Sequence, residues 1–309
     1  MIDLLLLGTG AMIPLPTRWL SSLLVRVDGS LILFDCGEGT QIAMRNHHWG
    51  FRKLDAICIT HHHADHVAGL PGLFYTVAAA GRTEPLHIWG PPGTIDIVTG
   101  LRVIVPGLPY DMIVHEVEGG DQFELPGGLR AEVAWGHHRV PVLGYRIEKP
   151  RDPAFDPAKA EALGIPKPLW GRLQKGETVT VEGREITPPM VRGPEREGVS
   201  FALTTDTRPT EALVELARGV DLLISEGTYG EDDDADAANE WGHMTYRQAA
   251  TQAAAAEVGA LWLTHFSASM NEPEEYAANA RDVFPNTTIG RAGLTGQLIF
   301  DEGYREIGG

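Results

Sequence analysis

A cluster of metal-binding side chains occupies the stretch Thr60-His61-His62-His63-Ala64-Asp65-His66, which follows the apolar run Leu54–Ile59. An apolar run of this length with β-branched residues is typical of a buried strand. Histidine and aspartate are ligands that zinc prefers, and His61 and His63, two apart in an extended loop, can point their imidazoles the same way. Asp65 and His66 then turn toward a neighbouring point at the start of the next predicted helix. The stretch therefore predicts one loop that serves two metal ions.

Two closely spaced ions need more ligands than one loop supplies, and one ligand should be a carboxylate able to bridge them. The candidates each follow another predicted strand: His137 and His138 after 129–135, Asp206 after 199–205 and His265 after 260–264. Loops at one edge of a sheet converge on a common site. Taken singly, Asp206 could instead cap the helix that begins near Pro209, and His265 could bond a neighbouring carbonyl. Taken together, these residues predict a single centre.

Strand and helix patterns alternate along the rest of the chain. Short apolar runs predict strands at residues 3–8, 22–27, 31–35, 54–60, 86–90, 113–117, 129–135, 143–148, 199–205, 221–225, 260–264 and 296–300. Helical patterns fit residues 38–48, 66–80, 93–101, 209–218, 244–257 and 272–283. Because both kinds of element occur in both halves, we expect an α/β protein with a two-sheet core and helices outside.

Composition limits the class of protein. The 309 residues carry a net charge of −17, which disfavours a broad electrostatic grip on nucleic acid. A phosphate-rich substrate must then be held by a local positive feature, such as bound metal ions. Two cysteines, Cys36 and Cys58, cannot form a disulfide framework, and the short apolar stretch after Met1 lacks the basic flank of a signal peptide. We therefore expect a cytoplasmic protein without a membrane anchor.

Residues 151–198 interrupt the alternation with many prolines and a helical piece near 157–163, which indicates an insertion. Residues 151–176 contain five basic and three acidic side chains, so this piece is +2 and the remainder is −19. Such a positively charged segment in an acidic chain could bind a polyanion, although an ordinary solvent-exposed loop explains the charges equally well. The acidic run 231–236 is predicted to be a solvated loop, because it lacks the ligand spacing of an EF-hand.

The stretch His61-x-His63-x-Asp65-His66 resembles the motif of the metallo-β-lactamase superfamily. Within that superfamily, the sequence is similar to the short-form ribonuclease Z family, the tRNA 3′-processing endonucleases, over nearly the whole chain. The most specific strings are Asp35-Cys36-Gly37-Glu38-Gly39-Thr40-Gln41 and Asp206-Thr207-Arg208-Pro209. Further matches are Gly8-Thr9-Gly10, Trp89-Gly90-Pro91-Pro92-Gly93, Gly144-Tyr145-Arg146, Glu226-Gly227-Thr228-Tyr229, His243-Met244-Thr245 and Thr264-His265-Phe266-Ser267.

The resemblance implies a metallo-β-lactamase αββα four-layer sandwich, with 1–309 as one hydrolase domain and 151–198 as an inserted flexible arm that clamps tRNA. It also implies a zinc-dependent endoribonuclease that removes the 3′ trailer of precursor tRNA by attack of a metal-activated water, and a homodimer. The cofactors would be two Zn²⁺, with other divalent metals such as Mn²⁺ as alternatives.

The resemblance assigns roles to individual residues. His61, His63 and His138 would hold the first ion, and Asp65, His66 and His265 the second, with Asp206 bridging them. His138 is preferred to His137 because it stands three residues before Pro141, as in the family, and His62 is not a ligand in that pattern. Asp65 would also accept the proton of the attacking water, while His243 and Glu226 would assist proton transfer to the leaving group.

Departures from the family pattern bear on the substrate. The segment Pro14-Leu15-Pro16-Thr17-Arg18-Trp19 keeps the Pro and Arg of a loop associated with the tRNA acceptor end but replaces its Lys and Asn, and Ser269-Met270 replaces Arg-Tyr. We expect looser discrimination at the 3′ end. Trp19 either stacks on an unpaired base or packs against the sheet. Two other functions stay open: a binuclear-metal phosphodiesterase for small or nonspecific diesters, and a nucleic-acid-binding module without catalysis, which the complete ligand set disfavours.

Overall fold

The computed structural model describes residues 1–308, which form two compact units. The core unit contains Met1–Lys149 and the chain from Val199 onward, and the arm unit contains Pro150–Gly198. In the described residues, no helix has both the length and the apolar character needed to cross a bilayer.

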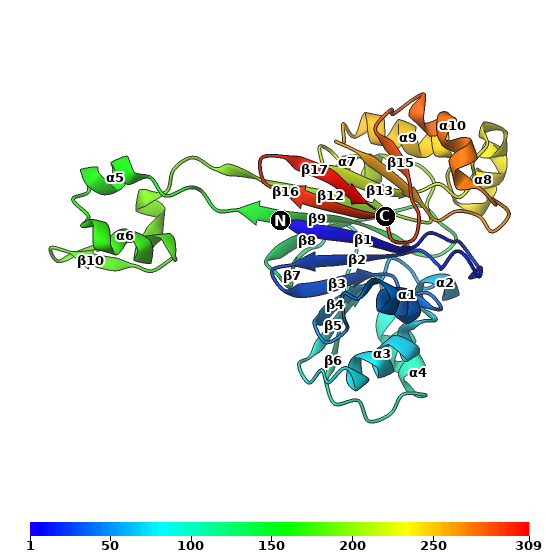
Figure 1. Ribbon diagram of the computed structural model, residues 1–309, viewed down its shortest axis with the longest axis horizontal. Coiled ribbons are helices and arrows are strands. Elements are labelled where there is room, and N and C mark those ends of the chain that lie inside the picture. Colours follow the sequence, from blue (N-terminus) through cyan, green and yellow to red (C-terminus); the bar gives the residue numbers. More distant parts are fainter. Residues whose placement is uncertain (309) are drawn as a thin grey trace. The chain divides into compact units, whose positions relative to one another are not determined.

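Two large sheets form the centre of the core unit (Figure 1). The first has the order β17-β16-β1-β2-β3-β4-β5-β6 and the second the order β15-β14-β13-β12-β9-β8-β7. The strands of the first sheet are β1 (Ile2–Gly8), β2 (Ser22–Val27), β3 (Ser30–Phe34), β4 (Leu54–Cys58), β5 (Leu86–Gly90), β6 (Met112–Glu116), β16 (Thr295–Ile299) and β17 (Gly303–Gly308). Those of the second are β7 (Gln122–Leu125), β8 (Leu129–Trp135), β9 (Leu143–Arg151), β12 (Arg196–Thr204), β13 (Leu222–Glu226), β14 (Leu261–Thr264) and β15 (Thr287–Ile289).

Helices cover the outer face of each sheet (Figure 1). On the first sheet these are α1 (Thr40–His47), α3 (Leu70–Ala79) and α4 (Thr94–Arg102), with the short α2 (Ala64–Val67) beside them. On the second are α7 (Glu211–Leu216), α9 (Tyr246–Ala255) and α10 (Ala277–Arg281), and α8 (Ala235–Trp241) precedes α9. The order helix, sheet, sheet, helix confirms the predicted αββα four-layer sandwich.

Side-chain alternation in the strands explains the layers, because successive residues of a strand face opposite sides. In β1, Leu4 and Leu6 join the core between the two sheets, whereas Leu5 and Leu7 join the core beneath α1 and α3. Both faces of this strand are therefore apolar, and its sequence is a continuous leucine run rather than an alternating pattern. Phe34 stacks edge-on against Tyr145 and Phe201 across the inter-sheet core, with ring centroids 5.6 and 5.8 Å apart.

The predicted helix at 66–80 is divided in the structure, with α2 ending at Val67 and α3 beginning at Leu70. A Cβ at Gly69 would lie 2.0 Å from the backbone oxygen of Gly37, so this turn requires glycine. The Gly69 amide donates to the carbonyl of Cys36 at 2.9 Å. The turn between α2 and α3 therefore binds the segment His61–His66 to the residues that follow β3. Helix periodicity does not reveal this tertiary contact.

The arm unit has a small core of its own. It contains α5 (Pro157–Ala162), α6 (Lys167–Gln174), the hairpin β10 (Val179–Val181) and β11 (Arg184–Ile186), and the 3₁₀ turn η1 (Pro188–Val191). Ile165, Leu173, Ile186 and Val191 are buried together, with Trp170 packed against them. The helix α6 was not expected from the sequence, because its first turn contains proline and its middle contains glycine. The side chain of Asp156 caps α5 by accepting from the amides of Ala158 and Lys159.

The acidic run 231–236 is only partly a loop, contrary to our expectation. It forms the 3₁₀ turn η2 (Asp232–Asp234) and enters α8, which begins at Ala235. Asp232 pairs with Arg247 of α9 at 2.6 Å, so at least one of these carboxylates has a structural partner. Acidic residues at the start of a helix are also favoured by its dipole.

Candidate metal centre and active site

The seven candidate ligands come from loops that follow four strands and from α2. His61 and His63 lie between β4 and α2, and Asp65 and His66 lie in α2. His138 follows β8, Asp206 follows β12 and His265 follows β14. Because β12, β13 and β14 are parallel neighbours, their carboxyl ends meet at one edge of the sheet.

Three residues around the centre have left-handed backbone conformations: Asp35 at φ 57°, Asp206 at 49° and His265 at 58°. Such conformations are uncommon for residues other than glycine and cost free energy, so the surrounding structure must hold them in place. Each of these residues directly follows a strand or lies within two residues of its end. The conformation turns the side chain toward the centre where an extended residue would continue along the strand.

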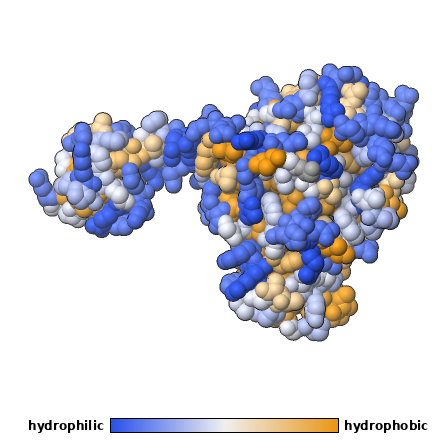
Figure 2. All heavy atoms as spheres, viewed as in Figure 1, coloured by the Kyte–Doolittle hydropathy of each residue, from blue (hydrophilic) through white to orange (hydrophobic). Residues whose placement is uncertain are grey.

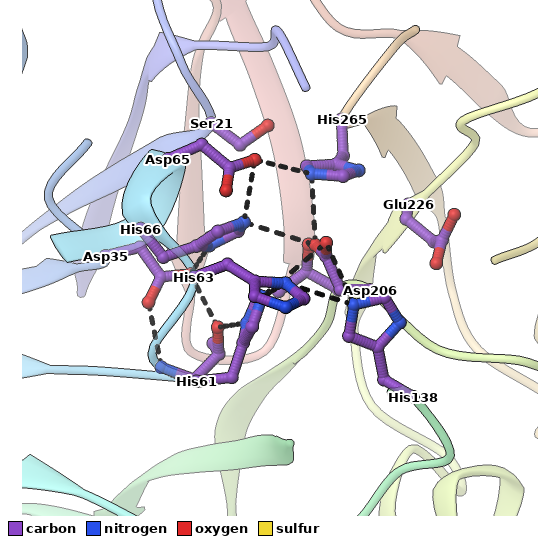
Figure 3. A network of polar contacts seen from close by, with 12 residues as sticks. Ser21, Asp35, His61, His63, Asp65, His66, His138, Asp206, Glu226 and His265 are labelled. Carbon is purple, nitrogen blue, oxygen red and sulfur yellow. Dashed lines mark hydrogen bonds and ion pairs between the residues drawn. The ribbon is translucent and has the colours of Figure 1, made fainter. Parts of the chain in front are cut away.

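The ligand atoms of the seven side chains form two groups, within each of which all atoms lie within 4.8 Å of one another. The first group is His61, His63, His138 and Asp206, and the second is Asp65, His66, Asp206 and His265. Asp206 belongs to both, and Figure 3 shows its carboxylate between them.

The two oxygens of Asp206 face different groups. Its Oδ2 lies 3.6 Å from Nε2 of His61 and 3.9 Å from Nε2 of His138. Its Oδ1 lies 3.3 Å from Nε2 of His66 and 3.1 Å from Nε2 of His265. One carboxylate that presents one oxygen to each of two nitrogen-rich groups has the orientation of a bridging ligand.

The outer ring nitrogens of the histidines have partners on the protein. Nδ1 of His61 contacts Oγ1 of Thr60 at 3.0 Å, and Nδ1 of His66 contacts Oδ2 of Asp35 at 2.8 Å. Nδ1 of His138 donates to the carbonyl of Gly242 at 3.0 Å, and Nδ1 of His265 contacts Oγ1 of Thr228 at 3.0 Å. Such partners fix the ring orientation and the tautomer, and metal-ligating histidines typically have them. The Nε2 atoms are thereby turned inward.

The histidine ring nitrogens that face the centre are arranged to bind a metal ion and not to hydrogen-bond with one another. Nε2 of His66 and Nε2 of His265 are buried without a hydrogen-bond partner. Nδ1 of His63 lies 3.1 Å from Nε2 of His61 and 3.2 Å from Nε2 of His138. Three ring nitrogens that can each offer a lone pair therefore surround one point. Buried polar atoms normally have partners, so a set without them calls for an explanation. A nitrogen and oxygen donor set of five His and two Asp is one that zinc accepts.

The pKa directions agree with this interpretation. Burial lowers the pKa of His61, His63 and His138, which favours the neutral imidazole that binds metals. Burial also disfavours charge on His66, but the negative charges of Asp206 and Asp35 outweigh it and raise the pKa of His66 well above its ordinary value. The second group is therefore a strongly negative environment that favours a cation.

Asp35 and Thr228 orient the candidate ligands, and sequence reasoning did not assign them a role. The Asp35 side chain accepts from the Thr60 amide, the Thr60 hydroxyl and His66 Nδ1, all at 2.8 Å. Thr228 connects His265 to Glu226, to which its hydroxyl donates at 2.6 Å. Asp35 and Thr228 both belong to strings that carry the family resemblance, Asp35–Gln41 and Glu226–Tyr229, and this was the available signal for each of them.

His243 and Glu226 form a pair beside the centre. His243 Nδ1 lies 3.1 Å from Glu226 Oε1, and their ligand atoms form a third group with His265. Glu226 is fully buried and also accepts from the amides of Thr207 and Met244. Burial disfavours the charged form of His243, but the negative charge of Glu226 outweighs it and raises the pKa of His243 to about 9. Glu226 thus touches no solvent and acts on its surroundings through His243 and the neighbouring backbone.

The neighbouring histidines lie outside the centre. His137 is exposed and is held through its backbone alone: its amide donates to the hydroxyl of Thr207 at 2.8 Å, and its carbonyl accepts from the amide of Arg208 at 3.0 Å. His62 turns away toward α4, where its Nε2 contacts Oγ1 of Thr94 at 2.8 Å. The structure therefore brings His138 rather than His137 to the other candidate ligands, and leaves His62 out.

A cavity of about 300 Å³ opens on the centre. It is lined by Met12, His63, Ala64, Asp65, His138, Arg139, Asp206, Trp241, His243 and His265. Within the described residues, larger cavities occur between α7 and α9, on the strands β7, β8 and β9, and in the arm unit, but none of them contains the candidate ligands. A volume near 300 Å³ is at the small end for a ligand site.

The loop after β1 is bound to the loop after β14 through Arg18. Its guanidinium donates to the backbone oxygens of Ser267 at 3.1 Å and Asn271 at 3.3 Å, and also to that of Met270. The Trp19 ring lies against Gly39, where a Cβ would come within 2.5 Å of it, and packs on the core beneath α1. Of the two alternatives for Trp19, the contacts favour packing.

Comparison with solved structures identifies the fold. YhfI of Bacillus subtilis, a metallo-β-lactamase fold protein, aligns with a TM-score of 0.70 and 19% identity over 96% of this chain and 100% of that chain. Human short-form tRNase Z aligns with a TM-score of 0.69 and 25% identity over 96% and 100%. Two family models match parts of the chain: "Anti-Pycsar protein Apyc1" at residues 2–96 and "Beta-lactamase superfamily domain" at residues 190–266. The sandwich with its His/Asp groups at one edge is thus a metallo-β-lactamase fold.

Curated relatives narrow this class further. Ribonuclease Z of Agathobacter rectalis is 45% identical over 302 residues, covering 98% of this chain and 100% of the relative. Ribonuclease Z of Clostridium beijerinckii is 46% identical over 308 residues, covering 98% and 100%. The chain belongs to the ribonuclease Z family. This confirms the resemblance that the Asp35–Gln41 and Asp206–Pro209 strings indicated.

Proposed function

We propose that this protein is a zinc-dependent endoribonuclease that removes the 3′ trailer of precursor tRNA by attack of an activated water on a phosphodiester. The observation that carries the proposal is the pair of four-residue groups that share Asp206, in a chain of the ribonuclease Z family. The alternative is hydrolysis of small or nonspecific diesters by the same centre, for which the small cavity is also large enough.

We assign His61, His63 and His138 to one Zn²⁺, Asp65, His66 and His265 to a second, and Asp206 to both. Mn²⁺ could replace zinc at such a donor set. Bound there, the ions would lower the pKa of a water molecule toward neutrality and neutralise charge on the phosphate oxygens. They would also supply the local positive charge that a chain of net charge −17 needs in order to accept a phosphodiester.

The protein's own groups then position the reactants and move protons. Asp65 lines the cavity, and its Oδ2 is held by the amide of Met12 at 2.9 Å, so it is fixed to orient the water and accept its proton. His243 also lines the cavity, and because its Nδ1 is engaged by Glu226, its Nε2 is the atom left to donate to the leaving oxygen. Glu226 is the positioning residue that keeps His243 protonated at Nδ1.

We propose that the arm unit binds tRNA away from the chemical centre. Over residues 150–198, eight basic side chains balance eight acidic ones, so the unit is neutral while the rest of the chain carries the whole net charge of −17. The positive excess lies in its first half, as the sequence indicated. Lys175, Arg192 and Arg196 line one cavity of about 500 Å³ in this unit together with Asp152, whose backbone carbonyl accepts from the Arg196 guanidinium. The three basic side chains give this cavity a net positive charge to offer a phosphate backbone.

We also propose a homodimer that joins through the layer of α1, α3 and α4. Exposed apolar side chains gather on this layer: Ile42 is 46% exposed, Tyr75 70%, and Val103 and Ile104 75% each. Figure 2 shows apolar atoms at the surface near the end of α4. Exposed apolar surface of this kind marks interaction sites. Light scattering should give twice the chain mass, and Tyr75→Glu should reduce it to the monomer; a monomeric unmodified protein would refute the dimer.

The function is tested by incubating the purified protein with a 3′-extended precursor tRNA and, in parallel, with bis-p-nitrophenyl phosphate. We expect a single cut at the 3′ end of the acceptor stem, loss of both activities after chelation, and their return with added Zn²⁺. Efficient hydrolysis of the small diester without cleavage of any precursor would favour the phosphodiesterase. Absence of both activities in the zinc-loaded protein would favour the binding module.

A further inference from the structure

An exposed tryptophan stands beside the centre and has no role in the chemistry described above. Trp241 is the last residue of α8, lines the cavity, and is 47% exposed. The guanidinium of Arg139 lies 4.2 Å from its ring centroid. A large aromatic ring that stays this exposed at the mouth of a site is a common anchor for a ligand.

The backbone fixes this pair next to two residues of the centre. Gly242 has φ 78°, and a Cβ there would lie 2.8 Å from Nδ1 of His138, so only glycine allows the end of α8 to approach this loop. The Gly242 carbonyl accepts from His138 Nδ1 at 3.0 Å. Trp241 and Arg139 are therefore each one residue from this contact, and His243 follows on the other side of Gly242.

The charges around the cavity single out Arg139. Among the described residues that line it, Arg139 alone carries a permanent positive charge, whereas Asp65 and Asp206 are acidic. The Arg139 guanidinium lies over one face of the Trp241 ring and can pair with a phosphate, and the exposed part of the ring can stack on a base. A nucleotide presents the two complementary features, an anionic phosphate and a flat base.

We propose that Trp241 and Arg139 form a subsite for one unpaired nucleotide that flanks the scissile phosphate, with its base stacked on the indole and its phosphate paired with the guanidinium. This inference rests on the proposed function. Stacking on an aromatic ring is tolerant of base identity, so the subsite favours single-stranded RNA at the cut without selecting its sequence. It gives a chain of strongly negative charge a contact to RNA that its overall electrostatics do not provide.

The test combines protein variants with abasic substrates. Precursor RNA is prepared intact, without the base 5′ of the scissile phosphate, and without the base 3′ of it. Trp241→Ala should raise KM for the intact RNA about 10-fold, and Trp241→Phe should restore most of this loss. The effect of Trp241→Ala should disappear on one of the two abasic RNAs, which identifies the stacked nucleotide. Trp135→Ala is the matched control, because Trp135 is 37% exposed but does not line the cavity.

Several outcomes would overturn the subsite. A Trp241→Ala effect that persists in full on both abasic RNAs would show that the ring does not stack on a base. An equal loss of kcat/KM for the precursor and for bis-p-nitrophenyl phosphate would show that Trp241 only supports the centre. Arg139→Ala should also raise KM and reduce the salt dependence of binding, and Arg139→Lys should recover the salt dependence. If the unmodified protein cuts no precursor, the proposed function fails first, which is a separate and visible result.

Discussion

Asp35 controls the tautomer of a candidate metal ligand, so Asp35→Asn should weaken metal binding without removing any ligand. In the native structure, Oδ1 of Asp35 accepts from the amide of Thr60, and Oδ2 accepts from both the Thr60 hydroxyl and His66 Nδ1. The backbone amide can only donate, so the oxygen of an asparagine must stay at the Oδ1 position. The amide nitrogen then replaces Oδ2 and faces His66 Nδ1 with a hydrogen. The Thr60 hydroxyl can rotate to accept, but His66 must move its proton to Nε2.

A proton on Nε2 of His66 points at Asp206 Oδ1, where the second metal ion is proposed to bind. Loss of such an orienting partner typically reduces metal affinity 10- to 100-fold, which corresponds to about 1.4–2.7 kcal/mol. The exchanged hydrogen bonds should also lower the free energy of unfolding by about 1–3 kcal/mol, because they are buried. We therefore expect one zinc ion to become weakly bound while the other is retained.

The assay is chelator competition for zinc, with metal content measured by mass spectrometry and stability by urea unfolding. Asp55→Asn is the matched control: Asp55 lies in β4, pairs with Arg82 at 2.7 Å, and is distant in the fold from the candidate ligands. It should lower stability modestly and leave zinc affinity unchanged. If Asp35→Asn binds two zinc ions as tightly as the native protein, Asp35 does not hold His66 for metal binding.

Three further predictions concern packing, backbone and substrate binding. Trp19→Ala should lower the free energy of unfolding by about 2 kcal/mol, because the half-buried ring packs on Gly39, and it should leave RNA affinity unchanged. Urea unfolding and filter binding measure the two effects. Weaker RNA binding at full stability would instead support stacking. Gly242→Ala should lower the free energy of unfolding by more than Gly50→Ala does, because a Cβ at Gly242 would also meet His138. Gly50 has φ 82° and open space around it, so Gly50→Ala should cost only the roughly 1–2 kcal/mol of left-handed strain. Equal losses of stability would show that the contact with His138 is unimportant. A short Gly-Ser linker can replace residues 152–195, because β9 and β12 are neighbours in the second sheet. This replacement should raise KM for precursor tRNA about 10-fold and change small-diester hydrolysis little. Equal loss of both activities would mean that the arm unit is structural.

The sequence predicted the parts of the fold that depend on local patterns. Apolar runs located twelve strands within a few residues of their observed bounds, because buried strands have continuous apolar composition. It missed β7, β15 and β17, which are short or half-exposed strands, and the hairpin of β10 and β11 in the arm unit. The helix α8 was missed because its residues Ala235–Trp241 follow an acidic run that is typical of a loop.

The candidate site was predictable where chemistry is concentrated in sequence, as in His61–His66. Residues His138, Asp206 and His265 were identified because each follows a strand, and the preference for His138 over His137 came only from family resemblance. The orienting contacts of Asp35 and Thr228, and the approach of Gly242 to His138, join segments far apart in the chain. Such contacts depend on how the two sheets pack together, which no local pattern encodes.

Anomalous diffraction at the zinc absorption edge, on crystals of the zinc-loaded protein, tests the two-metal centre most directly. We expect two peaks, one among His61, His63, His138 and Asp206 and one among Asp65, His66, His265 and Asp206. Both peaks should be lost or strongly reduced in Asp206→Ala. No peak at the centre, or a peak bound only by residues outside these two groups, would contradict the proposed two-metal centre.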